Sequence, residues 1–321
     1  MLLLRYNKIT NELFENLYQF LPSFRWGELT DFGKRIDTLQ YSTVADFLQE
    51  FKPIDATAVG DVFWPTGQNI CKWGKDQQVK VYFFQHGQWI YIQNKRNPRH
   101  LPHTTFLFGD NVKRMVDNWP YGKKSNIYST GTPRYDNIPL SAEGEYVYFA
   151  PPVMREMVPS APSKSNATAV NTITQLKGID EIVPLLIHPH YREGNLDYLK
   201  NLFPKATVAS PLSSSLSLIQ KSTKVLTHRN STTVLDAIAC GKKAILTDFL
   251  GEDRSFFKRG YFGEFAVENN WPKDCFKSIE AEYIVDYENY TERARDHIYL
   301  GNASQRIVNI LRQDGIIANG P

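Results

Sequence analysis

Residues 225–241 read VLTHRNSTTVLDAIACG, and this stretch decides the fold. It begins inside an apolar run of strand length, passes through a polar turn with three consecutive hydroxyl residues, and ends in an apolar run of helical spacing. Hydroxyl side chains favour the start of a helix, and a glycine, here Gly241, favours the position just after its end. The stretch therefore predicts a strand, a turn and a helix in succession, which is the repeating unit of a parallel α/β sheet.

The same alternation extends outward from this stretch in both directions. Strands are expected at residues 55–63, 79–84, 104–108, 146–150, 182–187, 207–209, 224–227 and 243–247, and helices near 10–21, 111–119, 168–177, 195–202, 213–220 and 232–239. Short, continuous apolar runs are typical of strands that are buried on both faces. The chain is therefore predicted to be an α/β protein with parallel sheets covered by helices.

Length and one polar segment predict two domains. A chain of 321 residues fits two domains of about 150 residues each. The turn-rich segment 139–145 separates the two series of strands. We therefore expect one Rossmann-like domain at residues 1–142 and a second at 143–321, facing each other across a cleft. The helical pattern at 287–312 allows the last helix to cross back onto the first domain.

Charge and cysteine content narrow the function classes. The formal net charge of +3 indicates no broad basic face, so nucleic acid is not an expected partner. The three cysteines are far apart and predict neither a disulfide framework nor a metal site. Because no apolar window approaches the roughly 20 residues of a membrane span, we expect a cytoplasmic protein. Candidates for contact with a lipid-linked acceptor or with the anionic inner face of the membrane are Phe24, Arg25 and Trp26, together with Lys95, Arg96 and Arg99. The alternative is a solvated face.

The strand ends of the second half carry groups that suit a phosphate. Ligands of parallel sheets bind beyond the carboxyl ends of the strands. Imidazole, guanidinium, amide and hydroxyl groups there are donors to phosphate oxygens, and so are the amides of a helix start. The candidates are His188, His190, Arg229, Asn230, Ser231, Thr232 and Thr233, with Asp236 one turn further for the hydroxyls of a ribose or sugar. The alternative is an ordinary helix cap.

The first half offers a candidate base. His86 follows the apolar run 79–84, between Gln85 and Gly87, and an imidazole at a strand end suits the removal of a proton from a hydroxyl. The alternative is a histidine that hydrogen-bonds to a loop carbonyl. Further candidates for the cleft or for acceptor binding are Asp61, Arg134 and Asp136, the last two of which can also pair within their turn. No metal-ligating set is recognised.

The order of four segments resembles a known family. QHG at 85–87, GTPRYD at 131–136, HPH at 188–190 and NSTTVLDAIACGKKAI at 230–245 resemble the two-domain GT-B glycosyltransferases, in particular the CDP-glycerol glycerophosphotransferases of surface-polysaccharide synthesis. The last two segments are also similar to transferases that use CMP-linked sialic acid or Kdo. The resemblance implies that His86 is the base and that His188, Ser231 and Thr232 hold the phosphate of the donor.

These observations together predict an inverting, metal-independent glycosyltransferase without a cofactor. Retaining GT-B enzymes carry two glutamates seven residues apart, and no second acid accompanies Asp236 here. The expected donor is a sugar linked to CMP, CDP or UDP, and the expected acceptor is a hydroxyl of a glycan or of a lipid-linked glycan of capsule or other surface polysaccharide. Two alternatives stay open: a nucleotide-sugar epimerase or hydrolase of the same fold, and a non-enzymatic protein that binds a sugar phosphate.

Overall fold

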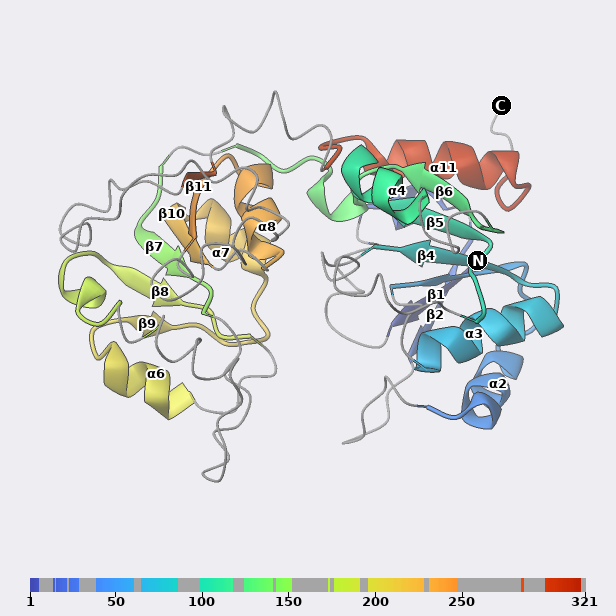
Figure 1. Cartoon of the computed structure of the whole chain (residues 1–321), viewed down its shortest axis with the longest axis horizontal. Coiled ribbons are helices and arrows are strands. Elements are labelled where there is room, and N and C mark those ends of the chain that lie inside the picture. Colours follow the sequence, from blue (N-terminus) through green and yellow to red (C-terminus); the bar gives the residue numbers. More distant parts are fainter. Residues whose placement is uncertain are drawn as a thin grey trace. The chain divides into compact units, whose positions relative to one another are not determined.

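The chain folds into two compact units in a computed structural model (Figure 1). Unit 1 comprises Met1–Asn137 and Arg293–Pro321, and unit 2 comprises Ile138–Glu292. The structure describes residues 1–5, 14, 16–21, 23–28, 39–60, 65–85, 99–117, 124–140, 143–151, 173, 176–190, 196–227, 231–246, 284–285 and 298–318. The chain passes from unit 1 to unit 2 between Asn137 and Ile138, before the segment 139–145, and the C-terminal segment Arg293–Pro321 belongs to unit 1. The domain boundary expected at 142/143 stays a prediction.

Unit 1 contains a six-stranded sheet whose strands all pair in parallel. Its order is β2 (Arg25–Glu28), β1 (Leu2–Arg5), β3 (Ala56–Val59), β4 (Lys80–Phe84), β5 (Thr104–Leu107) and β6 (Asn126–Ser129). The described helices are η1 (Tyr18–Phe20), α2 (Tyr41–Gln49), α3 (Pro65–Asp76), α4 (Asp110–Asp117), η5 (Pro133–Tyr135) and α11 (Ala303–Gln313). Every residue of β3 and β5 is buried, which explains why neither strand carries a charged side chain.

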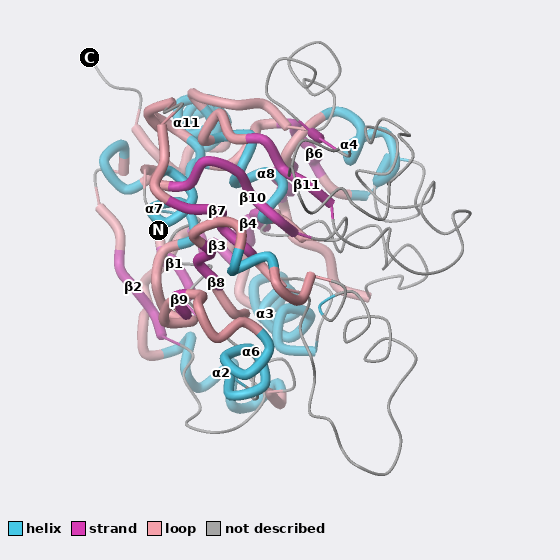
Figure 2. Tube along the Cα trace, turned by 90° about the vertical axis from the view of Figure 1, so that its left-hand side faces the viewer, coloured by secondary structure: helices cyan, strands magenta, loops and turns pink. Residues whose placement is uncertain are grey.

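Unit 2 contains a second six-stranded sheet, in which β12 (Ile284–Val285) is the antiparallel edge. The order is β12, β11 (Lys243–Leu246), β10 (Ser222–Thr227), β7 (Tyr146–Phe149), β8 (Leu185–Ile187) and β9 (Thr207–Val208). Its described helices are η6 (Ile179–Glu181), α6 (Leu196–Leu202), α7 (Ser215–Gln220) and α8 (Thr233–Ala239). Figure 2 shows the alternation of strand and helix along the chain. Two Rossmann-like α/β units are thereby confirmed.

The strand order of unit 2 has a switch point. From β7 the chain moves to β8 and β9 on one side, and then to β10 and β11 on the other. Loops that leave β7 and β10 therefore diverge, and the crevice between such strands is where ligands of open parallel sheets bind. The stretch 225–241 lies at this point, because it contains the end of β10 and the whole of α8. The strand and the helix that it predicted are confirmed, and the turn at 228–230 lies outside the described residues.

The last helix, α11, is attached to unit 1 at both ends. The Asp136 carboxylate accepts hydrogen bonds from the backbone N–H groups of Ala303 and Ser304, each at 2.8 Å. At the other end, Asp314 accepts hydrogen bonds from the Tyr82 hydroxyl at 2.8 Å and from Lys80 Nζ at 2.7 Å. Burial, together with the bond to Asp314, strongly raises the pKa of Tyr82. The C-terminal segment is therefore an integral part of the core of unit 1.

The N-terminal aromatic residues make their described contacts inside unit 1. Phe24 and Trp26 are partly buried against its core, with ring centroids 5.7 Å apart, and Phe24 also stacks on Tyr18 at 5.7 Å. Arg25 Nη2 donates to the carbonyl of Pro53 at 2.9 Å. Contact of these residues with a membrane surface stays a prediction. None of the helices in the described ranges is long and apolar enough to cross a bilayer.

Candidate functional site

The carboxyl ends of β8 and β10 bring the predicted phosphate residues to one edge of the unit 2 sheet. β7 pairs in parallel with both strands, so the three carboxyl ends lie at the same edge. His188 directly follows β8, and Ser231, just before α8, is the fourth residue after the end of β10. Residues far apart in the sequence thus share the edge at which the strand order reverses.

His188 is held by β7 from two sides. Its backbone N–H donates to the carbonyl of Phe149 at 2.8 Å. Its Nδ1 lies 2.6 Å from the hydroxyl of Tyr148, and the two rings are 5.7 Å apart at an angle of 65°. The residue is half-buried, and Nε2 is shielded from solvent, so a ligand reaches that nitrogen only when the covering atoms shift. Main chain and ring are therefore both fixed relative to the sheet.

The start of α8 presents its hydroxyl groups at the boundary of the core. Ser231, Thr232 and Thr233 are half-buried, while the helix from Val234 onward is buried. Ser231 Oγ accepts a hydrogen bond from the backbone N–H of Thr233 at 3.2 Å, which forms a local turn just before the helix. Thr232, the N-cap residue of α8, makes no side-chain cap hydrogen bond. A hydroxyl that accepts one hydrogen bond retains its own proton to donate, so this turn and a contact with phosphate are compatible.

Asp236 is placed differently from the other phosphate-site candidates. Only 2% of its surface is exposed, and its carboxylate accepts a hydrogen bond from the hydroxyl of Ser215 in α7 at 3.0 Å. This hydrogen bond connects α7 to α8, because the Asp236 side chain lies on the face of α8 that is turned toward α7. The predicted contact with a ribose or sugar stays a prediction.

The remaining candidates divide into described and undescribed residues. His86, Gly87, Asp61, Arg229 and Asn230 lie outside the described residues. The described candidates in the first half are Gln85, Arg134 and Asp136, and His190 in the second half is half-buried two residues after His188.

The described first-half candidates make contacts within unit 1. Gln85 is buried directly after β4. Its side-chain carbonyl accepts a hydrogen bond from the backbone N–H of Phe108 at 2.8 Å, which connects the end of β4 to the end of β5. Arg134 lies 5.8 Å from the ring of Tyr135. Asp136 caps α11, as described above. A role for these three residues in acceptor binding stays a prediction.

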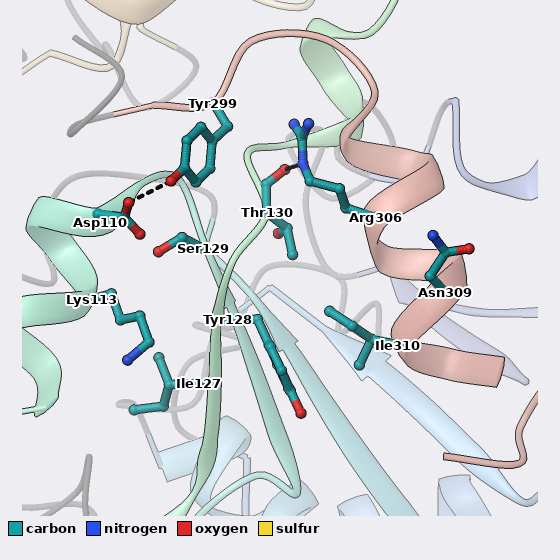
Figure 3. Close-up of a pocket in the computed structure, with 10 residues that line it drawn as sticks. All are labelled: Asp110, Lys113, Ile127, Tyr128, Ser129, Thr130, Tyr299, Arg306, Asn309 and Ile310. Atoms are coloured by element: carbon teal, nitrogen blue, oxygen red, sulfur yellow. Dashed lines mark hydrogen bonds between the residues drawn. The ribbon is translucent and has the colours of Figure 1, made fainter. Parts of the chain in front are cut away.

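Unit 1 also contains an open pocket that the sequence analysis did not anticipate (Figure 3). It has a volume of about 380 Å³, and its lining comes from α4, β6, α11 and the segment before α11: Asp110, Lys113, Ile127, Tyr128, Ser129, Thr130, Tyr299, Arg306, Asn309 and Ile310. No local pattern reveals it, because it joins residues 110–130 to residues 299–310.

The charged side chains Arg306 and Asp110 of this pocket form hydrogen bonds with other groups of unit 1. Arg306 donates from Nε to the carbonyl of Thr130 at 2.8 Å and from Nη2 to that of Gly301 at 2.6 Å. The Tyr299 hydroxyl donates to Asp110 (Figure 3). Burial opposes ionisation of Asp110, but the neighbouring Ser129 and Tyr299 hydroxyls and the positive charges of Arg114 and Lys113 together outweigh it and lower its pKa. These bonds join the returning C-terminal segment to the ends of β5 and β6.

Comparison with known proteins identifies the fold. No protein-family model and no curated protein matches the sequence. Among the solved structures that match over nearly the whole chain, three illustrate the similarity. A protein from Listeria monocytogenes assigned as a UDP-N-acetylglucosamine 2-epimerase has a TM-score of 0.61 and 12% identity, covering 100% of this chain and 97% of its own. The wall teichoic acid polymerase TagF has a TM-score of 0.61 and 12% identity, covering 98% of this chain and 88% of its own.

The third structure is UGT89C1 of Arabidopsis thaliana, solved in complex with UDP-L-rhamnose, with a TM-score of 0.55 and 11% identity, covering 98% of both chains. At these identities the similarity establishes the fold. The class that the two sheets and these structures define is the two-domain Rossmann-like fold of the GT-B type.

Proposed function

We propose that this chain is a glycosyltransferase that moves a sugar from a nucleotide-linked donor to a hydroxyl of a glycan or lipid-linked acceptor. The observation that carries the proposal is the placement of His188 and the hydroxyl-rich start of α8 at the switch point of the unit 2 sheet. Donor groups at this point suit the phosphate of a nucleotide.

The proposed chemistry is a single displacement with inversion. His188, with the hydroxyls of Ser231, Thr232 and Thr233, donates hydrogen bonds to the leaving phosphate, on which negative charge grows as the glycosidic bond breaks. Arg229, Asn230 and His190 are further donors in this proposal. His86 takes the proton of the acceptor hydroxyl, whose oxygen attacks the sugar from the opposite side. No metal is needed, because hydrogen bonds neutralise the developing charge.

The structural neighbours support a nucleotide-sugar donor and a surface-polymer product. UGT89C1 was solved with UDP-L-rhamnose, and TagF is a wall teichoic acid polymerase. UDP-, CDP- and CMP-linked sugars are therefore the donors to test first. The Listeria neighbour favours a second candidate, a nucleotide-sugar epimerase that needs no acceptor.

Nucleotide release measured with and without an acceptor distinguishes these functions. We expect purified protein mixed with a UDP-, CDP- or CMP-linked sugar to release nucleotide at least about tenfold faster when an oligosaccharide acceptor is added, since bound water is a poorly positioned substitute for an oriented hydroxyl. The same rate of donor consumption without acceptor would instead identify an epimerase or hydrolase. Binding of the donor without any turnover would identify a sugar-phosphate binding protein.

A further inference from the structure

Tyr148 carries a polar hydroxyl group at a fully buried position of β7. Only 1% of its surface is exposed, and it lies in β7 between Val147 and Phe149, both of which belong to the core on the other face of the sheet. A phenylalanine would fill the same apolar space, whereas a buried tyrosine hydroxyl needs a hydrogen-bond partner. The hydroxyl lies 2.6 Å from Nδ1 of His188.

The donor and acceptor roles in this hydrogen bond depend on the tautomer of His188. An imidazole nitrogen with a lone pair is a better acceptor than a phenol oxygen, so we expect the Tyr148 hydroxyl to be the donor. With Tyr148 as donor, Nδ1 of His188 carries the lone pair, and the ring proton resides on Nε2. The hydrogen bond at one ring nitrogen thus decides which nitrogen is protonated.

We propose that Tyr148 is a positioning residue that holds His188 in the tautomer with its proton on Nε2. This inference rests on the proposed function for its consequence: an Nε2–H group donates to a phosphate oxygen, but it does not accept a proton through that nitrogen. The arrangement assigns His188 to stabilisation of the leaving phosphate and leaves removal of the acceptor proton to another group. The bond from the backbone N–H of His188 to Phe149 adds to the fixed orientation.

Tyr146 provides a matched control on the same strand. Its hydroxyl donates to the backbone carbonyl of Leu218 at 2.8 Å, and it points to the same face as Tyr148, because alternate residues of a strand share a face. Tyr146→Phe therefore removes an equivalent hydroxyl from β7 without touching the histidine. Tyr148→Phe removes the hydroxyl that faces Nδ1 and leaves the ring in place.

The test is the tautomer of His188, read from the nitrogen chemical shifts of protein labelled with ¹⁵N-histidine. The seven histidines are distinguished by comparison with the spectrum of His188→Ala. We expect the Nε2–H tautomer of His188 in the unmodified protein and in Tyr146→Phe, and a shift toward the Nδ1–H tautomer in Tyr148→Phe. An Nδ1–H tautomer in the unmodified protein, or an unchanged tautomer in Tyr148→Phe, would overturn the inference.

Nucleotide binding separates this inference from the proposed function. UDP, CDP and CMP are first titrated into the unmodified protein, and Tyr148→Phe is expected to raise the Kd for the nucleotide that binds most tightly by about tenfold, the effect of one disturbed hydrogen bond, while Tyr146→Phe leaves it unchanged. Failure of the unmodified protein to bind any of the three nucleotides would count against the proposed function, and the tautomer would still decide the role of Tyr148. Because the unmodified protein is measured first, the inference can fail even if a variant does not fold.

Discussion

Replacing His188 with alanine is expected to lower kcat/KM for glycosyl transfer by about 100-fold or more. The substitution removes a donor that is fixed in place by Phe149 and Tyr148 and that, in our proposal, faces the charge developing on the phosphate. Loss of one such prearranged donor typically costs about 100-fold to 1,000-fold in rate. The measurement is steady-state transfer with the donor and acceptor identified by the nucleotide-release assay.

His86→Ala is the comparison variant, because it tests the proposed base rather than a group that holds the donor. A general base contributes about 100-fold to 10,000-fold to turnover without holding the donor, so this variant should lose kcat while its Kd for the donor stays nearly unchanged. His188→Ala should change both quantities. Transfer near the normal rate in His188→Ala would remove this residue from the site, and transfer near the normal rate in His86→Ala would remove the proposed base.

Gly131→Ala is expected to destabilise unit 1 by about 3 kcal/mol or more. Gly131 has a φ of +76°, and a Cβ atom there would lie 2.1 Å from the carbonyl oxygen of Tyr299. The left-handed conformation costs an alanine about 1–2 kcal/mol. The collision adds to this cost, because the Tyr299 backbone is held in place by its own hydrogen bond to Phe108 at 2.8 Å.

Gly315 supplies the control for this substitution. It has a φ of +73°, and nothing lies within 4 Å of the position of an added Cβ, so Gly315→Ala should cost only the conformational part, about 1 kcal/mol. The readout is urea unfolding followed by tryptophan fluorescence, to which the buried Trp73 of unit 1 contributes. Equal unfolding midpoints for the two variants would show that the approach of Tyr299 to Gly131 does not constrain the fold.

Local patterns predicted the parts of the fold in which each strand is buried on both sides. Runs such as 79–84 and 104–108 are mostly apolar, and they correspond to β4 and β5. β1 and β2 were not predicted. Each spans only four residues, and the β1 segment, Leu2–Arg5, finds its partners at Arg25–Glu28 and at Thr57–Ala58, so its strand character depends on distant residues.

Sequence separation between interacting residues also determines which residues of the site could be predicted from the sequence. Hydroxyl residues at a helix start after an apolar strand have a local signature, so Ser231, Thr232 and Thr233 could be singled out. Tyr148 could not, because its partner lies 40 residues further along the chain. The contact of Asp136 with α11 spans 167 residues, and its turn alone indicated only a pairing with Arg134 or a place at the cleft.

The measurement that tests the central claim most directly is the difference in affinity between a nucleotide and its nucleoside. Isothermal titration of UDP against uridine, and of CDP and CMP against cytidine, isolates the contribution of the phosphates. For at least one of these pairs we expect the nucleotide to bind about 100-fold more tightly, as two charge-assisted hydrogen bonds would give. The double variant Ser231→Ala, Thr232→Ala should reduce that ratio at least about tenfold. An unchanged ratio in the double variant, or no preference for any of the three nucleotides over its nucleoside, would contradict a phosphate site at the start of α8.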